Sequence, residues 1–132
     1  MSQQNVALVQ SLYDAFARGD IPTVVGAMDP NIEWIEPEAP GYPFGGVYRG
    51  PQEVVDHVFA RLQTYYQEIA FLPQEFVDDG DRVLILGESR GKAKASGTSF
   101  QVSFVQVLTF HDGKWTRFQH YTNTGVIAAA LS

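Results

Sequence analysis

Three polar side chains interrupt apolar, alternating runs of the chain, and their types suit acid–base chemistry. Glu36 shares the parity of Trp34, and His120 shares the parity of Phe118, while Gln106 lies among apolar residues of its own parity. A carboxylate and an imidazole can shuttle a proton, and an amide N–H can stabilise a developing oxyanion. We therefore expect Glu36, His120 and Gln106 to meet in an apolar pocket and to move a proton on a small hydrophobic carbonyl compound.

Each of these side chains also has a purely structural interpretation. A neighbouring backbone group could satisfy Gln106 or His120, because buried polar groups need hydrogen-bond partners. Glu36 could reach solvent or a helix N-terminus from the end of its strand, since glutamate is usually exposed. The sequence alone leaves both interpretations open for all three residues.

Aromatic residues from several segments could form the walls of such a pocket. Aromatic side chains often simply fill a core, but small-molecule sites are also lined mainly by apolar and aromatic groups. The candidate ligand contacts are Tyr13, Phe16, Trp34, Tyr48, Phe59, Phe104, Phe118 and Thr122. The partner expected from this set is a small apolar or aromatic molecule.

Other catalytic arrangements are missing from the sequence. His57, His111 and His120 lack the spacing of metal ligands, and no glycine-rich nucleotide loop or Gly-x-Ser-x-Gly motif occurs. We therefore expect no metal and no organic cofactor. The chain contains no cysteine, which excludes thiolate chemistry and disulfides.

Gln106 and His120 belong to a predicted β-hairpin over 97–124. Residues 99–110 alternate with a period of two, which is typical of a strand. Asp112-Gly113 separates this run from a second one at 115–123, and Asp-Gly suits the positive φ angles of a tight turn. Both side chains are predicted to project from an apolar face of the sheet.

Three helices are predicted ahead of this hairpin. Apolar residues at steps of three and four predict an amphipathic helix at 3–17. Asp20 and Pro22 suit the start of a second helix, which Asp29-Pro30 would end. Gly50-Pro51 suits the start of the third.

Shorter segments complete the predicted sheet. The expected strands are 32–37, 68–77, with an edge or bulge at Pro73, and 83–86. The expected loops are 38–50, which carries several aromatic residues, and 91–97. The tail 126–131 is alanine-rich and is predicted to form a short helical turn.

The composition restricts the classes of partner. The chain has 132 residues and a formal net charge of −6, with nine scattered basic residues, which argues against nucleic-acid binding. It has neither a secretion signal at its N-terminus nor an apolar run of the roughly 20 residues that a membrane span needs. We expect one domain over 1–132 in a cytoplasmic protein without membrane association.

Helices followed by a meandering sheet predict an α+β fold, a cone-shaped curved antiparallel or mixed sheet wrapped around three N-terminal helices. The element order and several motifs resemble the nuclear transport factor 2-like superfamily, and more narrowly its SnoaL-like branch, related to ketosteroid isomerase. The resemblance covers essentially the whole chain and implies a cystatin-like α+β barrel. The motifs that carry it are Ala15-Phe16-Ala17-Arg18-Gly19-Asp20, Trp34-Ile35-Glu36-Pro37, Tyr48-Arg49-Gly50-Pro51 and Phe118-Gln119-His120-Tyr121-Thr122-Asn123-Thr124.

The resemblance also implies roles for individual residues. The isomerase's general base precedes a proline on the first strand, where this chain has Glu36-Pro37. The isomerase's oxyanion-stabilising tyrosine corresponds to Leu12, so Tyr13 is expected to point elsewhere on the helix. Its second oxyanion donor corresponds to Gln106, whose amide can donate a hydrogen bond.

Three classes of function remain open, because this fold hosts enzymes as well as proteins without chemistry. One is a cofactor-free isomerase, cyclase or dehydratase, and another is a noncatalytic binder of a small apolar molecule. The third is a dimeric interaction module. The resemblance implies a homodimer, and Val105, Val107 and Tyr121 on the outer parity of the long strands are apolar enough to be buried in one.

Overall fold

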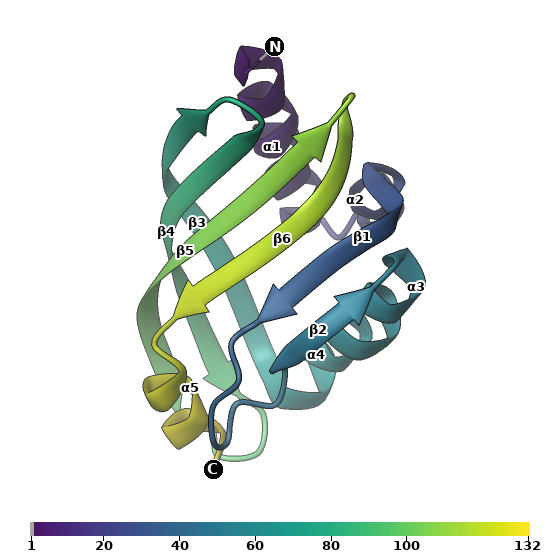
Figure 1. The fold of residues 1–132 in the computed structure, drawn as a ribbon. Coiled ribbons are helices and arrows are strands. Elements are labelled where there is room, and N and C mark those ends of the chain that lie inside the picture. Colours follow the sequence, from purple (N-terminus) through teal and green to yellow (C-terminus); the bar gives the residue numbers. More distant parts are fainter. Residues whose placement is uncertain (1) are drawn as a thin grey trace.

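A curved six-stranded sheet dominates residues 2–132, the part of the chain that the computed structural model describes (Figure 1). The strand order is β2-β1-β6-β5-β4-β3, and β1 and β6 form the parallel pair among otherwise antiparallel neighbours. The strands are β1 (Met28–Glu36), β2 (Gly46–Arg49), β3 (Tyr66–Asp79), β4 (Arg82–Ala93), β5 (Ser99–His111) and β6 (Lys114–Thr122). The predicted α+β class with a curved mixed sheet is confirmed, although the sheet stays open between β2 and β3 and does not close into a barrel.

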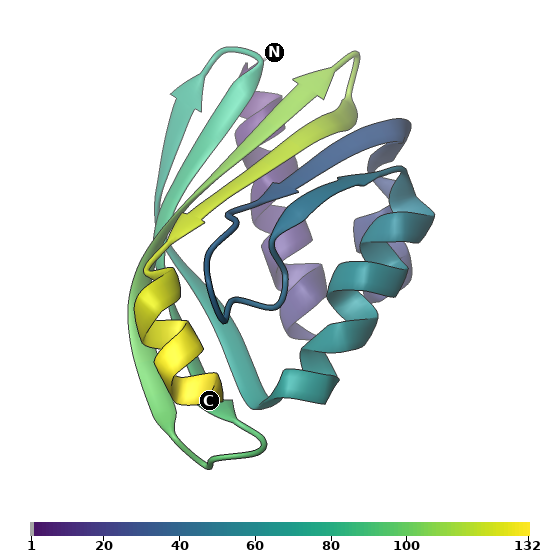
Figure 2. The same ribbon diagram turned by 60° about the horizontal axis from the view of Figure 1, so that its bottom comes forward.

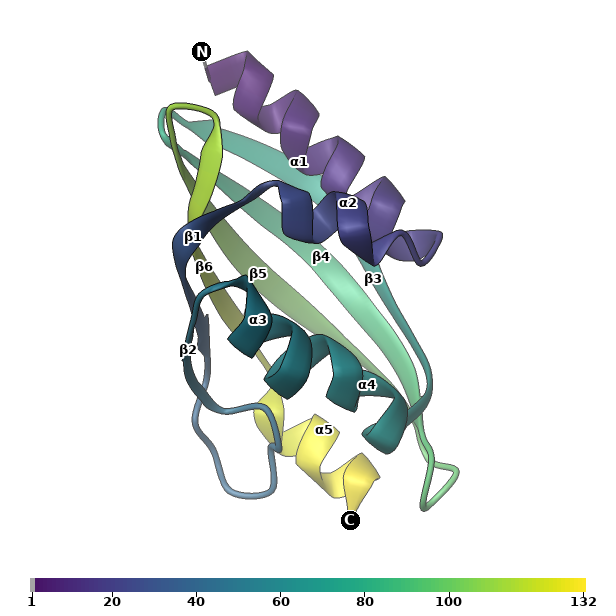
Figure 3. The same ribbon diagram turned by 90° about the vertical axis from the view of Figure 1, so that its right-hand side faces the viewer.

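The helices cover the concave side of the sheet (Figures 2 and 3). A continuous helical stretch over 51–65 contains a π-helical turn, η1, which the sequence did not indicate. A short C-terminal helix lies at the end of the cone where β6 terminates. The helices are α1 (Ser2–Ala17), α2 (Ile21–Gly26), α3 (Pro51–Val54), η1 (Val55–Phe59), α4 (Ala60–Tyr65) and α5 (Thr124–Leu131).

Capping side chains explain where two short helices begin. The Asp20 carboxylate accepts a hydrogen bond from the Thr23 backbone N–H at 3.3 Å, and Pro22 lies in the first turn of α2. The Asn123 side chain accepts from the Val126 N–H at 3.2 Å and starts α5. The predicted start of α2 is confirmed.

The predicted hairpin is present, and its turn has the expected chemistry. Asp112 and Gly113 both have positive φ angles, 50° and 77°, as a type I′ turn between twisted strands requires. The resulting register pairs Gln106 of β5 directly with His120 of β6. The hairpin therefore places these two side chains side by side on the concave face.

The first strand begins earlier than predicted. Asp29-Pro30 was expected to end a helix, but both residues belong to β1, where Met28 pairs with Trp115. A register shift between Met28 and Glu33 interrupts the ladder with β6, so Pro30 is accommodated without a ladder hydrogen bond.

The edge strand β3 and its neighbour β4 are also longer than predicted. Tyr66 pairs with Ala93, so β4 continues through the first part of the expected loop 91–97. The expected irregularity at Pro73 is confirmed, since the register shifts between Pro73 and Glu75 on this edge strand.

No helix within residues 2–132 combines the length and the apolar character needed to cross a membrane.

Candidate active site

The concave face of the sheet and the helices enclose a largely apolar cavity of about 90 Å³. This volume is several times what a single water molecule needs. Some lining residues are only partly buried, and they belong to α1, the helical stretch 51–65 and β3. These residues are Tyr13, Phe16, Phe59, Leu62, Ile69 and Phe71.

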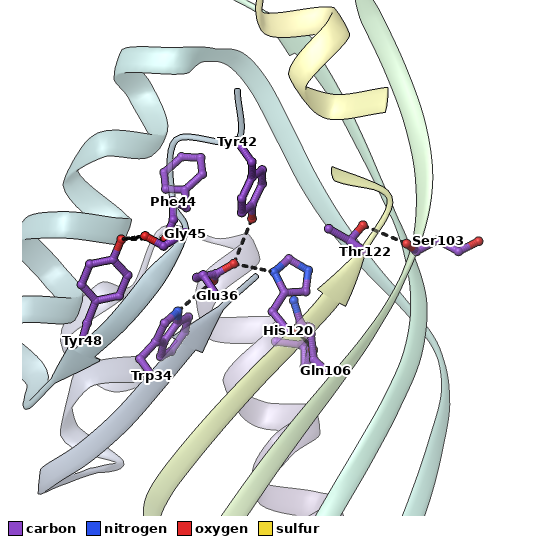
Figure 4. A network of polar contacts seen from close by, with 11 residues as sticks. Trp34, Glu36, Tyr42, Phe44, Gly45, Tyr48, Ser103, Gln106, His120 and Thr122 are labelled. Atoms are coloured by element: carbon purple, nitrogen blue, oxygen red, sulfur yellow. Dashed lines mark hydrogen bonds and ion pairs between the residues drawn. The ribbon is translucent and has the colours of Figure 1, made fainter. Parts of the chain in front are cut away.

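Glu36 brings a carboxylate into this cavity and is itself 5% exposed. The alternation of β1 points Glu36 and Trp34 to the same face, and the Trp34 indole N–H donates to Glu36 Oε2 at 2.8 Å. The Tyr42 hydroxyl, from the loop between β1 and β2, donates to Oε1 at 2.9 Å. His120 Nδ1 lies 2.9 Å from the same Oε1 (Figure 4).

The contacts of Glu36 determine which nitrogen of His120 carries a hydrogen. An ionised carboxylate only accepts hydrogen bonds, so the Nδ1 that faces Oε1 must be the donor. The Nε2 atom on the other side of the ring is buried and has no hydrogen-bond partner. Within residues 2–132, His120 Nε2 is the one buried side-chain nitrogen or oxygen left without a partner. Such an atom requires an explanation, because burying an unpaired polar group is costly.

Gln106 lies beside His120 and is held by the first helix. The Tyr13 hydroxyl donates a short hydrogen bond to Gln106 Oε1. This contact turns the Gln106 amide so that its Nε2 group stays free of hydrogen bonds to residues 2–132 and lies next to the imidazole (Figure 4). The site therefore presents a hydrogen-bond donor and an acceptor on neighbouring strands.

Burial keeps the tyrosines around the cavity protonated. It raises the pKa of Tyr42 far above its usual range, and the nearby negative charge of Glu36 raises it further. Burial also raises the pKa of Tyr13 and of Tyr66. These phenols therefore keep the hydrogen that a donor needs, and Tyr42 and Tyr13 donate it to Glu36 and Gln106.

The structure brings together most of the residues that the sequence singled out. Glu36, His120 and Gln106 converge on the cavity as expected. The aromatic candidates found on its wall are Tyr13, Phe16, Trp34, Phe59 and Phe118, with Trp34 stacked on Phe118 at 3.7 Å between ring centroids. Their functional roles remain predictions.

Three candidate ligand contacts do not line this cavity. The Phe104 ring instead covers Gly87, where an added Cβ would lie 2.6 Å from the ring. The Tyr48 hydroxyl donates to the Phe44 carbonyl at 2.6 Å, and its ring stacks on His57. The Thr122 hydroxyl donates to the Ser103 carbonyl at 2.9 Å, because β6 ends at this residue and leaves the concave face.

Tyr13 corrects an expectation drawn from the resemblance. It was expected to point elsewhere on the helix because Leu12 takes the matching position, but both residues line the cavity. A helix covered by a sheet buries a stripe at least 100° wide, so two successive residues can both face inward. The tyrosine hydroxyl is therefore retained in the site from the neighbouring position.

Several residues that line the cavity were not predicted from the sequence. Tyr42 lies in a segment predicted only as an aromatic-bearing loop, and Tyr66 lies just outside the predicted strand. Ser89 has the same parity as Val83 and Ile85, so extending the predicted strand by a few residues would have found it. Parity was thus the available signal for Ser89, whereas nothing in the sequence placed Tyr42 against Glu36.

The fold and the site together define a class of protein, an α+β cone that encloses a largely apolar cavity with a buried carboxylate–imidazole pair. The chain belongs to the SnoaL-like domain family, whose model matches residues 9–118. No curated protein sequence matches the chain.

Solved structures agree with this family. A nuclear transport factor 2-like protein of unknown function from Burkholderia pseudomallei is 30% identical, with 97% of each chain covered and a TM-score of 0.89. TerC, co-crystallised with polyporic acid, is 29% identical over 96% of this chain and 97% of its own, with a TM-score of 0.87. A putative SnoaL-like polyketide cyclase from Jannaschia is 19% identical over 98% of this chain and 92% of its own, with a TM-score of 0.85, and shares the fold.

Proposed function

We propose that the cavity binds a small conjugated carbonyl compound and that His120 moves a proton on it without a cofactor. The observation that carries this proposal is the orientation of His120, whose Nδ1 contacts Glu36 while its Nε2 has no partner. A nitrogen with a free lone pair beside an apolar cavity is suited to take a proton from a bound molecule.

The contacts of Glu36 argue for a supporting role of this carboxylate. The sequence suggested Glu36 as the general base, but its two oxygens already accept from Trp34, Tyr42 and His120. Taking up a substrate proton would cost one of these hydrogen bonds. We therefore give the proton-accepting role to His120, while Glu36 fixes the ring and stabilises the imidazolium that forms.

The proposed step transfers a proton from the carbon next to the carbonyl group. The C–H electron pair moves into the new C=C bond, the proton goes to His120 Nε2, and the carbonyl oxygen becomes an enolate. The free Gln106 N–H group donates a hydrogen bond to this oxygen. Return of the proton from Nε2 to a different carbon gives an isomer. Attack of the enolate carbon on a second carbonyl group, with return of the proton from Nε2 to the alkoxide that forms, gives a cyclised product.

Two solved structures support conjugated carbonyl compounds as ligands. TerC was crystallised with polyporic acid, and the protein from Jannaschia is described as a putative polyketide cyclase. The aromatic walls of the cavity also favour planar molecules, because aromatic side chains such as Trp34 and Phe118 pack well against flat rings. Binding without chemistry is the second function that this cavity supports.

Proton exchange on a simple ketone tests the proposal without knowledge of the natural substrate. Acetophenone in D₂O exchanges its methyl hydrogens through the enolate, and NMR follows the loss of the methyl signal. We expect the protein to accelerate this exchange and His120→Gln to reduce the acceleration about 100-fold or more. His111→Gln is the matched control, because His111 is exposed in the hairpin turn. Equal exchange in His120→Gln, or none above the buffer rate in the native protein, would refute the acid–base role.

We also propose a homodimer through the convex face of the sheet. Leu86, Val105 and Tyr121 are register partners across β4, β5 and β6, and form an apolar row there. Tyr121 remains 53% exposed and Leu86 36% exposed in the single chain. Large exposed apolar side chains grouped in a row are typical of a protein–protein interface.

A further inference from the structure

Two buried hydroxyl groups in the cavity take no part in the proton transfer described above. Ser89 of β4 is 2% exposed and Tyr66 of β3 is 6% exposed, and both side chains line the cavity. No hydrogen bond from either hydroxyl to the described side chains or backbone is present, and neither oxygen is fully enclosed by protein atoms, unlike His120 Nε2. Both hydroxyls are therefore open to the cavity and can pair with a polar group of a bound molecule.

Packing constraints on β4 explain why residue 89 is small, but they do not explain why it is a serine. The inward-facing positions on either side are Gly87 and Gly91, where an added Cβ would lie 2.6 Å and 2.5 Å from the rings of Phe104 and Phe100. A small side chain is therefore required along this part of β4, but Ala93 shows that alanine serves at an inward-facing position of the same strand. The serine hydroxyl adds a polar atom that packing alone does not require.

Tyr66 is held by its ring, which leaves its hydroxyl available. The ring stacks on Phe44 with centroids 5.9 Å apart and contacts Phe100 at 5.7 Å. Phe100 in turn packs on Gly91, the inward-facing neighbour of Ser89. Burial and the charge of Glu36 raise the pKa of Tyr66, so the hydroxyl stays a hydrogen-bond donor.

We propose that Ser89 and Tyr66 form a second polar subsite, which binds a hydroxyl group on the ring of an aromatic carbonyl ligand. The inference rests on the proposed function, because the carbonyl end of the same ligand would meet His120 and Gln106. No lysine or arginine is among the described residues that line the cavity. The subsite therefore suits a neutral hydroxyl and disfavours a carboxylate or phosphate, which would lack a countercharge.

Binding of matched ketones tests the subsite. The compounds are 3- and 4-hydroxyacetophenone, with 4-methylacetophenone as the control of similar size, and NMR titration gives each Kd. We expect the native protein to bind one hydroxyacetophenone about threefold to tenfold more tightly than the methyl compound, as one or two neutral hydrogen bonds would give. The double substitution Ser89→Ala with Tyr66→Phe should bring this ratio close to one, whereas the control Ser99→Ala, at an exposed position outside the cavity, should keep it.

The possible outcomes separate this inference from the proposed function. Equal binding of all ketones by the native protein, including no measurable binding of any, would overturn the subsite, as would an unchanged preference in the double variant. Acetophenone itself carries no ring hydroxyl and cannot use the proposed subsite. The dependence of its deuterium exchange on His120 therefore tests the proposed function independently of Ser89 and Tyr66.

Stability of the empty protein gives a second test that needs no ligand. Removing a buried hydroxyl without a partner should leave the Tm of Ser89→Ala unchanged or higher, because functional groups are often retained at a cost in stability. A fall of several degrees would mean that the Ser89 hydroxyl serves the fold and would overturn its assignment to a ligand.

Discussion

The imidazole of His120 and the carboxylate of Glu36 form a buried pair in which one ring nitrogen is occupied and the other is free. Nδ1 lies 2.9 Å from Oε1, and Nε2 has no partner. The two residues are 84 positions apart in the sequence, and the parallel pairing of β1 with β6 brings them together. A carboxylate that holds one nitrogen of a histidine fixes the tautomer and directs the other nitrogen.

Replacing Glu36 by Gln should reduce the exchange reaction while preserving the fold. The amide has one acceptor oxygen where the carboxylate has two, so it cannot satisfy Trp34, Tyr42 and His120 together, and it cannot stabilise an imidazolium. We expect deuterium exchange on acetophenone to fall about 100-fold, with the circular dichroism spectrum retained. The same rate in Glu36→Gln would show that Glu36 does not support the base.

Removing the Tyr42 hydroxyl should lower stability by an amount typical of a hydrogen bond to a charged group. Tyr42→Phe deletes the 2.9 Å bond to Glu36 Oε1, and we expect the free energy of unfolding to fall by about 1.5–3 kcal/mol. Urea denaturation measures this change. Ser99→Ala, which removes an exposed hydroxyl, should change it by less than about 0.5 kcal/mol. A similar small effect in both variants would mean that the Tyr42–Glu36 hydrogen bond does not contribute to the free energy of unfolding.

The Gln106 amide should increase the rate of deuterium exchange through its N–H group. Tyr13 should increase this rate by holding that amide in place. Gln106→Leu removes the proposed oxyanion donor, so we expect deuterium exchange to fall about 100-fold. Tyr13→Phe leaves the donor in place but frees the amide to rotate, so its effect should be smaller. A larger loss in Tyr13→Phe than in Gln106→Leu would contradict this division of roles.

Stability should decline at alkaline pH because three tyrosines around the cavity resist ionisation. The pKa values of Tyr13, Tyr42 and Tyr66 are raised in the folded state, whereas an unfolded tyrosine ionises near pH 10. Above about pH 10 the unfolded chain loses protons that the folded chain keeps, so the free energy of unfolding falls as pH rises. Urea denaturation at several pH values should show this decline, and Tyr42→Phe should make it shallower. An identical slope in that variant would rule out Tyr42 as a contributor.

The proposed dimer should depend on the apolar row of the convex face. Light scattering should give about twice the chain mass of 14.6 kDa for the native protein. Tyr121→Glu places a charge in this apolar row and should yield single chains, because an unpaired charge is costly in a buried interface. A native mass near that of one chain would reject the dimer.

Alternating parity carried most of what the sequence could reveal about this site. It placed Glu36 with Trp34, and Gln106 with the inward face of its strand, because a buried side of a sheet fixes register strongly. The same rule failed for Thr122, since the last residue of β6 leaves the concave face. Parity predicts on which face of the sheet a side chain lies. It does not predict the residue at which the strand ceases to line the cavity.

The details that decide the chemistry came from contacts between distant segments. Tyr42 reaches Glu36 from an irregular loop, and Tyr13 reaches Gln106 across 93 positions. Sequence periodicity cannot show such contacts, because they depend on how α1 and the loop after β1 pack against the sheet. These contacts moved the proposed base from Glu36 to His120.

The tautomer of His120 decides whether this histidine can act as the base. Two-dimensional ¹H–¹⁵N NMR of histidine side chains distinguishes a protonated ring nitrogen from a bare one, and His120→Gln identifies the signals. We expect, for the unliganded protein, a hydrogen on Nδ1 and a bare Nε2. A hydrogen on Nε2 would contradict the proposed role of His120, because this nitrogen could then not accept a proton.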